Sequence, residues 1–208
     1  MDAPAPPMPP VDLALVIALD GSASVTYDEF GLMAGGLAAA LRKPEVAAGL
    51  LGGIRRASLA AVLLWSAADA QEVVVPWTRL DSPASLAAFA QAVEDVNRLV
   101  PASTTAIGAA LAACMRLLIT APATAGRLIV DVAGDGRSND GMDPVPVRDR
   151  MVASGITING LCVLHEEPDL LESYRREVIG GPGAFALTCP DYAAFEIAMA
   201  QKLAREIA

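Results

Sequence analysis

The sequence predicts an α/β fold, a doubly wound three-layer sandwich in which helices cover both faces of a mostly parallel central sheet with one antiparallel edge strand. Strand-like and helix-like segments alternate along the chain, which is the order that gives parallel strands joined by helical crossovers. The first strand-like segment, residues 11–19, is apolar apart from Asp12, as expected for a central strand covered on both faces. Two β-prone segments at 57–65 and 72–77 are close enough to form a hairpin, which predicts the antiparallel edge.

Helical spacing of apolar residues characterises the segments between these strands. Thr26 and Glu29 have the spacing of a capping box, and the apolar residues that follow repeat at helical intervals up to residue 41. Asp191 is the expected N-cap of the last helix. Further helices are expected at 44–51, 82–97, 107–119, 145–154, 169–178 and 190–207, and further strands at 127–133, 156–164 and 184–187.

Length and composition indicate a single domain. The chain has 208 residues, of which 54% are hydrophobic and 19% charged, and this balance favours a packed core over disorder. We assign residues 1–10 to a Pro/Ala-rich N-terminal tether and residues 11–208 to the domain. The formal net charge of −9 disfavours nucleic acid as a partner, because that binding needs a positive surface.

The apolar segments are about ten residues or shorter, against roughly 20 residues needed to span a bilayer, so we expect a soluble protein without membrane insertion. The chain begins without a charged leader and signal-peptide core, yet its Pro/Ala-rich start is of a kind often found just after a cleavage site. The sequence therefore predicts a periplasmic or secreted protein if a signal peptide was removed, and a cytoplasmic protein otherwise.

The three cysteines show no pattern of metal binding. Cys114, Cys162 and Cys189 lack Cys-x-x-Cys spacing, and the chain has a single histidine to assist them. We expect buried free thiols, the usual state of such cysteines. The alternative is a disulfide between Cys162 and Cys189, because both lie in apolar segments that could be neighbouring strands.

Short oxygen-bearing side chains stand where predicted strands end or helices begin. Asp20, Ser22 and Ser24 follow the first strand as Asp-x-Ser-x-Ser, in which alternate residues of an extended backbone point the same way. Thr105 precedes a predicted helix, and Asp135 follows a predicted strand. In a doubly wound fold such loops meet at the carboxyl ends of the strands, where ligands bind. One or two carboxylates with neutral oxygens suit Mg²⁺, so these residues form a candidate site for a divalent cation.

Each of these residues also has a simpler interpretation. Short polar side chains commonly cap helices and satisfy turn amides, so Asp20, Ser22 and Ser24 taken singly need no metal. An aspartate before a glycine, such as Asp135, is common in turns. The metal site is favoured because all these oxygens fall on loops that are predicted to meet at one edge of the sheet.

Three motifs resemble the metal-ion-dependent adhesion site of von Willebrand factor type A domains in order and spacing: DGSAS at 20–24, TAIG at 105–108 and DG at 135–136. The likeness covers nearly the whole chain. The register of the second motif selects Thr105 over Thr104 as the binding threonine. Other segments resemble a bacterial, often exported, uncharacterised subfamily of these domains, a domain of unknown function: 130–136, 158–161 and 179–185.

The resemblance implies that Ser22, Ser24 and Thr105 supply hydroxyl ligands, with Asp20 and Asp135 acting directly or through water. It implies a bound divalent metal, Mg²⁺ or else Mn²⁺ or Ca²⁺. It also implies binding of a protein partner, whose acidic side chain completes the metal shell, and no catalysis.

The leading functional prediction is therefore a divalent-metal-dependent protein-binding module. The alternative is a metal-dependent hydrolase or phosphatase, in which the cation activates water and Asp20 or Asp135 acts as the base. An aspartyl-nucleophile phosphatase would need a second carboxylate where Ser22 stands. A structural module that has lost its ion is a third possibility.

Three other polar residues fall in predicted loops. His165 is the single histidine and is expected in a solvent-exposed loop, which leaves a serine triad without support. Arg137 and Asn139 follow Asp135 and are candidates for a rim that faces the partner.

Overall fold

The sheet has six strands and the predicted doubly wound topology. The structure, a computed structural model, describes residues 8–207, and its strand order is β3-β2-β1-β4-β5-β6. β3 runs antiparallel to β2, as predicted for the hairpin edge, and the other pairings are parallel. Most of the predicted tether, residues 1–7, lies outside the described residues. The strands are β1 Val11–Asp20, β2 Ser58–Trp65, β3 Gln71–Leu80, β4 Ala125–Gly134, β5 Ile156–Val163 and β6 Ala186–Cys189.

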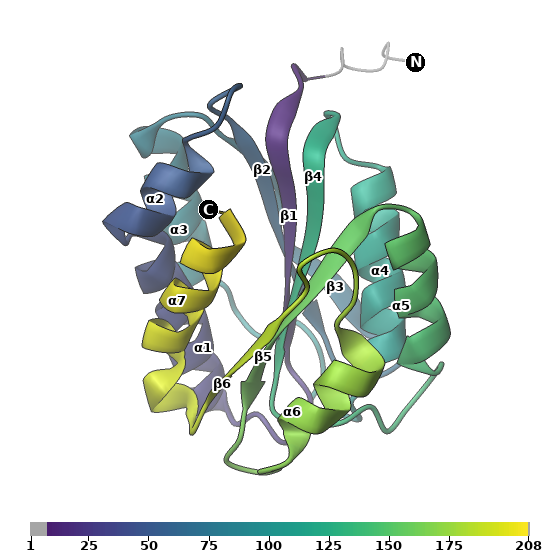
Figure 1. The fold of residues 1–208 in the computed structure, drawn as a ribbon. Helices are drawn as coiled ribbons and strands as arrows, with labels where there is room; N and C mark the ends of the chain where they lie inside the picture. The colour runs from purple at the N-terminus through teal and green to yellow at the C-terminus, as the bar shows by residue number, and fades with distance from the viewer. Residues whose placement is uncertain (1–7, 208) are drawn as a thin grey trace, which may run out of the picture.

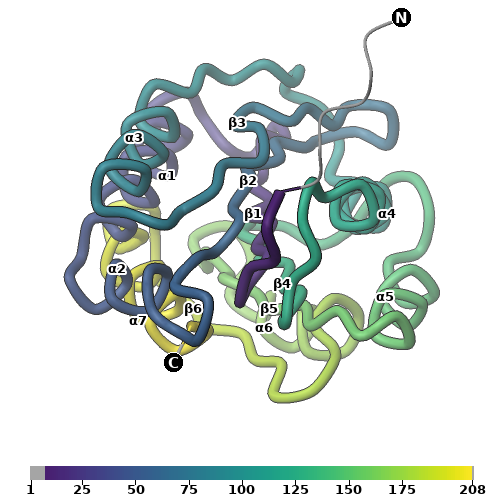
Figure 2. Tube along the Cα trace, turned by 90° about the horizontal axis from the view of Figure 1, so that it is seen from above, coloured from purple at the N-terminus to yellow at the C-terminus, as the bar shows by residue number. Residues whose placement is uncertain are grey.

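Helices cover both faces of the sheet (Figure 1). α1, α2, α3 and α7 form one layer, and α4, α5 and α6 lie on the opposite face. The view along the strands shows α4 and α5 separated by the sheet from α1, α2, α3 and α7 (Figure 2). The helices are α1 Tyr27–Leu41, α2 Pro44–Leu50, α3 Pro83–Glu94, α4 Ile107–Ile119, α5 Pro144–Ala153, α6 Leu170–Ser173 and α7 Phe195–Ile207.

Two apolar clusters fill the space between the sheet and its helical layers. β1 contributes to both, because alternate side chains of a strand point to opposite faces. Leu15 and Ile17 pack on the side of α1, whereas Val16 and Ala18 pack on the side of α4, and all four are fully buried. This double burial explains why β1 is apolar from Leu13 to Leu19, before the polar side chain of Asp20 at its end.

The C-terminal elements differ in detail from the predicted ones. The expected helix at 169–178 is divided into the short α6 and a π-helical turn, Tyr174–Val178, which closes with a hydrogen bond from Ile179 N to Tyr174 O. Asp191 caps a 3₁₀ turn, Tyr192–Ala194, by accepting from Ala194 N at 2.9 Å, and α7 follows that turn. β6 begins later than predicted, because the amide of the preceding Phe185 donates to the Asn159 side chain.

All three cysteines are buried free thiols, so the alternative of a disulfide is wrong. Cys162 and Cys189 do lie in neighbouring strands, β5 and β6. In the parallel register, however, Cys189 lies opposite Val163, one residue beyond Cys162. Successive residues of a strand point to opposite faces, so the two thiols belong to the apolar clusters on opposite sides of the sheet.

A charged cluster is buried where α7 packs on the sheet. Lys202 of α7 is fully buried and forms ion pairs with Asp131 of β4 and with Glu206, one turn further along its own helix. Glu206 also accepts a hydrogen bond from Asn159 Nδ2 of β5 at 2.8 Å. Because a buried charge without its partner is costly, this cluster fixes α7 to the centre of the sheet.

Replacing Lys202 with Met would leave Asp131 and Glu206 buried without their cation. We expect Lys202→Met to lower the free energy of unfolding by about 3–5 kcal/mol, the usual cost of breaking a buried ion pair. Gln201→Ala, at an exposed neighbouring position, is the control and should change it by less than about 0.5 kcal/mol. Urea unfolding followed by circular dichroism measures both, and equal stability of the two variants would contradict the role of the cluster.

Candidate metal centre

The loop after β1 folds back on the carboxylate that ends the strand. The backbone amide of Ser22 donates to Asp20 Oδ1 at 2.7 Å, which is the geometry of an aspartate turn. The hydroxyls of Ser22 and Ser24 lie 3.2 Å apart. Asp20 and Ser22 are fully buried, and Ser24 is partly exposed. The spacing Asp-x-Ser-x-Ser therefore brings three oxygen-bearing side chains together at the carboxyl end of β1.

Asp135 joins this group from the neighbouring strand. β1 and β4 pair in parallel with Leu19 opposite Ala133, so both strands end at the same level of the sheet. Ser24 Oγ donates to Asp135 Oδ1 at 2.6 Å, although the two residues are far apart in the sequence. Asp135 is fully buried. The loop after β4 thus closes over the loop after β1.

Thr105 reaches the same place from the loop before α4. Its amide donates to Asn139 Oδ1 at 2.8 Å, and its carbonyl accepts from Asn139 N at 2.9 Å. Its hydroxyl faces Gly136, where an added Cβ would lie 3.8 Å from Thr105 Oγ1. All five predicted residues are therefore brought together, four through direct hydrogen bonds and Thr105 through the loop after Asp135.

The structure distinguishes Thr105 from Thr104. Thr104 is exposed, and its hydroxyl donates to Asp140 Oδ2 at 2.7 Å. Thr105, in contrast, is only 5% exposed. α4 begins after Ala106 without a side-chain cap, which leaves the Thr105 hydroxyl free of that role.

Two carboxylate oxygens in this cluster lack a partner. Asp20 Oδ2 and Asp135 Oδ2 are buried and make no hydrogen bond within the described residues. Burial, and then the charge of Asp135, raises the pKa of Asp20 to about 7. Burial also raises the pKa of Asp135. A divalent cation would compensate such oxygens, and the set of two carboxylates and three hydroxyls matches the preference of Mg²⁺ for oxygen ligands.

A pocket of about 230 Å³ leads from this cluster to the surface. Ser24, Thr105 and Asp135 form its inner wall. The other residues that line it are Ala23, Ser103, Gly136, Arg137, Asn139, Glu166 and Glu167. Arg137 is paired with Glu167 at 2.9 Å and with Asp169. Arg137 and Asn139 thus both lie on the rim, as expected, and Asn139 has the additional task of positioning Thr105.

Arg98 positions the loop after β1 and was not predicted. Its guanidinium donates to the carbonyls of Gly21 and Ser22, each at 2.6 Å, and to that of Val25 at 2.7 Å. Nothing local to residue 98 indicates this contact, because it joins loops more than 70 residues apart in the sequence.

His165 lies in an exposed loop, as expected. Its side chain is 24% exposed and lies beside the cluster, with Nε2 4.0 Å from Asp135 Oδ2 and 3.4 Å from Glu29 Oε1. Its ring packs edge-on against Tyr192, with ring centroids 5.5 Å apart. The loop after β5 folds back over the end of the sheet, which brings an imidazole next to the carboxylates.

Comparison with protein families identifies the family of this chain. The sequence profile described as "Protein of unknown function (DUF1194)" matches residues 10–208. The chain belongs to this family. No curated protein sequence matches the DUF1194 chain at a significant level.

Several solved structures share the fold of this DUF1194 chain. The von Willebrand factor type A protein from Catenulispora acidiphila is 20% identical, with a TM-score of 0.65. The aligned region covers 94% of the DUF1194 chain and 43% of that protein. Proximal thread matrix protein 1 from the mussel byssus, with a zinc-occupied MIDAS motif, is 16% identical, with a TM-score of 0.65 and coverages of 95% and 48%. The pilus adhesin SpaC from Lactobacillus rhamnosus GG is 11% identical, with a TM-score of 0.67 and coverages of 94% and 30%.

At these identities the likeness shows the fold alone, and the DUF1194 chain has the α/β fold of the von Willebrand factor type A protein. It spans less than half the length of each of these three structures. Within residues 8–207, no helix is long and apolar enough to cross a membrane. The same residues contain no group of three or more His, Cys, Asp and Glu side chains able to hold a metal ion.

The pKa of Asp20 predicts a pH-dependent effect of Asp20→Asn in the absence of metal. Between about pH 4 and 7 the unfolded chain loses this proton while the folded protein keeps it, so the wild-type protein loses stability as the pH rises through this window. We expect Asp20→Asn to be more stable than the wild type by about 2–4 kcal/mol at pH 8 and nearly equal to it at pH 4.

Urea unfolding in EDTA at pH 4, 6 and 8 measures this difference. The comparison at pH 4 is the internal control, because the folded protein keeps the Asp20 proton there and the unfolded chain has lost only about half of it. A stability difference that is constant across the three pH values would show that Asp20 is not destabilised by its buried charge.

Proposed function

We propose that this domain is a divalent-metal-dependent protein-binding module. The ion is Mg²⁺, with Mn²⁺ or Ca²⁺ as substitutes, and an acidic side chain of the partner completes its shell. The proposed ligands are the hydroxyls of Ser22, Ser24 and Thr105, with the carboxylates of Asp20 and Asp135 binding directly or through water.

The observation that carries this proposal is the pair of buried carboxylate oxygens without a partner, next to three hydroxyls. A site for an isolated water would not need two ionisable groups in an apolar surrounding, where each charge is costly. A cation lowers that cost, and hydroxyl ligands add no further negative charge to it. The bound ion would then still attract a carboxylate from outside.

The charge around the pocket supports dependence on the metal. Glu166 and Glu167 line the rim, and Glu29 lies beside His165. The rim cation Arg137 is already paired with Glu167 and Asp169. An acidic partner approaching the metal-free site would be repelled by these carboxylates, so the ion itself would have to supply the attraction.

The similar structures supply the other support. One of them is described with a zinc-occupied MIDAS motif, and another is a pilus adhesin. The donor set of this chain contains oxygen and no thiolate, which favours Mg²⁺, Mn²⁺ or Ca²⁺ over zinc. The hydrolase alternative has less support, because an aspartyl-nucleophile phosphatase would need a second carboxylate where Ser22 stands.

Metal titration tests the site. We expect the wild-type protein to bind one Mn²⁺ or Mg²⁺ ion in calorimetry, and Asp20→Ala to bind at least about 100-fold more weakly, because a direct or water-bridged carboxylate is lost. Asp28→Ala, which removes an exposed carboxylate from α1, is the matched control and should bind as the wild type does. Equal binding by wild type and Asp20→Ala would reject the assignment.

Arg98 provides a test that leaves every proposed ligand in place. Arg98→Met removes the donors that hold the carbonyls of the loop, so we expect Mn²⁺ affinity to fall about tenfold, as for residues that orient metal ligands. Arg42→Met, which removes an exposed arginine paired with Glu94, should leave the affinity unchanged. Unchanged affinity in Arg98→Met would show that the loop is positioned without it.

Capture of partners from the native host tests the function. We expect proteins that bind the domain in Mg²⁺ to be released by EDTA and to be absent with Asp20→Ala. Hydrolysis of p-nitrophenyl phosphate that disappears in Asp20→Ala, without any metal-dependent partner, would favour the hydrolase instead.

A further inference from the structure

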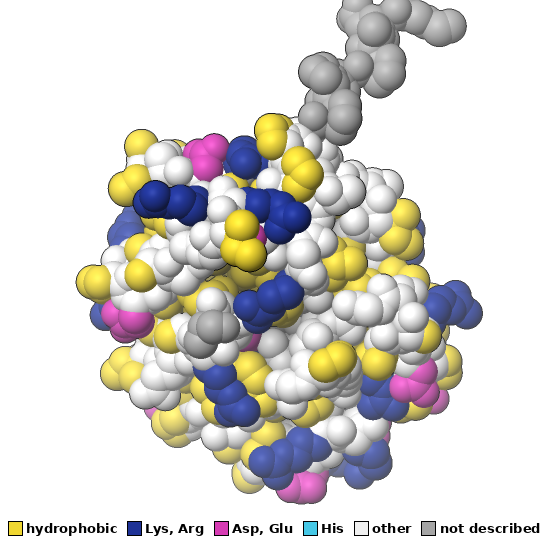
Figure 3. Space-filling view, turned by 45° about the horizontal axis from the view of Figure 1, so that its top comes forward, with side chains coloured by type: hydrophobic (Ala, Val, Ile, Leu, Met, Phe, Trp, Pro, Cys, Tyr) yellow, Lys and Arg dark blue, Asp and Glu magenta, His cyan; other side chains and the backbone are white. Residues whose placement is uncertain are grey.

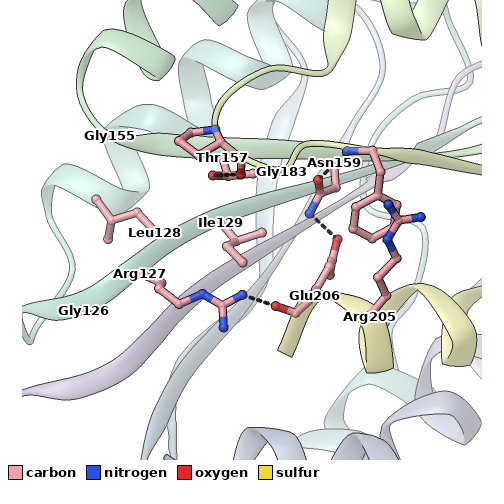
Figure 4. Close-up of a pocket in the computed structure, with 12 residues that line it drawn as sticks. Gly126, Arg127, Leu128, Ile129, Gly155, Thr157, Asn159, Gly183, Arg205 and Glu206 are labelled. Carbon is pink, nitrogen blue, oxygen red and sulfur yellow. Dashed lines mark hydrogen bonds between the residues drawn. The ribbon is translucent and has the colours of Figure 1, made fainter. Parts of the chain in front are cut away.

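A second cavity, of about 390 Å³, lies at the end of the sheet opposite the candidate metal centre (Figure 4). Its walls are the first residues of β4 and β5, the loop before β6, and the last turn of α7. A volume of this size is typical of sites for small organic molecules. The cavity shares no residue with the pocket at the metal centre.

The cavity exists because β6 is short. β6 pairs with β5 only from Gly160 onward, so on the edge that faces away from β4 the first half of β5 has no strand partner, only a bridge between Ile158 and Gly180. The loop before β6 is instead held by Asn159, whose Oδ1 accepts from Phe185 N at 3.0 Å. Asn159 is 2% exposed, and its Nδ2 donates to Glu206. The cavity wall is therefore fixed by buried hydrogen bonds.

Two arginines line the cavity without an acidic partner among the described residues. Arg205 of α7 stacks on Phe185, with its guanidinium carbon 3.9 Å from the ring centroid, and none of its five donors makes a hydrogen bond within residues 8–207. Arg127 of β4 donates one hydrogen bond to the backbone carbonyl of Glu206, and its other donors make none within the described residues. Figure 4 shows the two guanidinium groups on either side of Glu206.

The nearby carboxylates share Lys202, and Glu206 Oε2 makes no hydrogen bond within the described residues. Glu206 is bound by Lys202 and Asn159, and Asp131 by Lys202. Although the chain carries a net charge of −9, Lys and Arg side chains predominate over Asp and Glu on the face at this end of the molecule (Figure 3). The cavity thus lies on a locally positive face of an acidic protein.

The rest of the lining is largely apolar. Carbon surface comes from Leu128 and Ile129 of β4, from Pro182 and from the ring of Phe185. The glycines at 126, 155 and 183 add no side chains to the lining. An apolar interior with guanidinium groups at its edge fits a ligand with an apolar body and an anionic head.

We propose that this cavity binds a small organic carboxylate with an apolar body. Its carboxylate accepts bidentate hydrogen bonds from Arg205 and a further hydrogen bond from Arg127. A planar guanidinium fork matches the two oxygens of a carboxylate. A doubly charged phosphate is disfavoured, because Asp131 and Glu206 share one cation, Lys202, behind the cavity wall. This site is independent of the proposed metal-dependent function.

Benzoate is a suitable probe, with neutral benzamide of the same shape as its control. The full chain, labelled with ¹⁵N, is titrated in EDTA so that the metal centre cannot take part. We expect saturable benzoate binding that shifts the backbone amides of Gly126, Gly155 and Gly183, and benzamide binding at least about tenfold weaker.

Variants complete the test. Arg205→Gln should weaken benzoate binding about tenfold and Arg127→Gln less, whereas Arg150→Gln, an exposed arginine outside the cavity, should have no effect. Mn²⁺ binding should be the same in Arg205→Gln as in the wild type, which keeps this proposal separate from the metal site. The proposal is overturned by absent or non-saturable binding, by equal binding of benzamide, by tighter binding of phenyl phosphate, or by shifts confined to the metal centre.

Discussion

An electrostatic constraint governs this fold: two carboxylates, Asp20 and Asp135, lie buried at the ends of neighbouring parallel strands. In an apolar surrounding they repel each other, and each keeps one oxygen without a partner among the described residues. The Ser22 amide and the Ser24 hydroxyl satisfy the other two oxygens. A cation bound at this end of the sheet would compensate the remaining negative charge.

The surrounding structure holds these groups in place. β1 and β4 are the central strands, covered on both faces, so their ends cannot separate without exposing the core. Arg98 fixes the loop after β1, and Asn139 fixes the loop before α4. Charge is also divided along the strands, with carboxylates around the proposed cation site and arginines around the proposed anion site. A protein of net charge −9 can thereby offer opposite binding chemistry at its two ends.

The parts of this arrangement that are encoded by consecutive residues could be predicted from the sequence. The apolar run of β1 and the motif at 20–24 sufficed to place a central strand and its polar end, because both are patterns of consecutive residues. The roles of Arg98 and His165 could not be predicted, since each depends on loops that meet only after folding. The π turn at Tyr174–Val178 was missed for the same reason, because helical periodicity does not reveal how a helix ends against the sheet.

Anomalous diffraction from crystals grown with Mn²⁺ tests the central claim most directly. We expect one strong peak among the side chains of Ser22, Ser24 and Thr105, with the nearest protein oxygens about 2.0–2.3 Å from the ion. Asp20 and Asp135 are expected to bind the ion directly or through water. A peak held instead by Glu29, His165 and Glu166, or no peak at this end of the sheet, would contradict it.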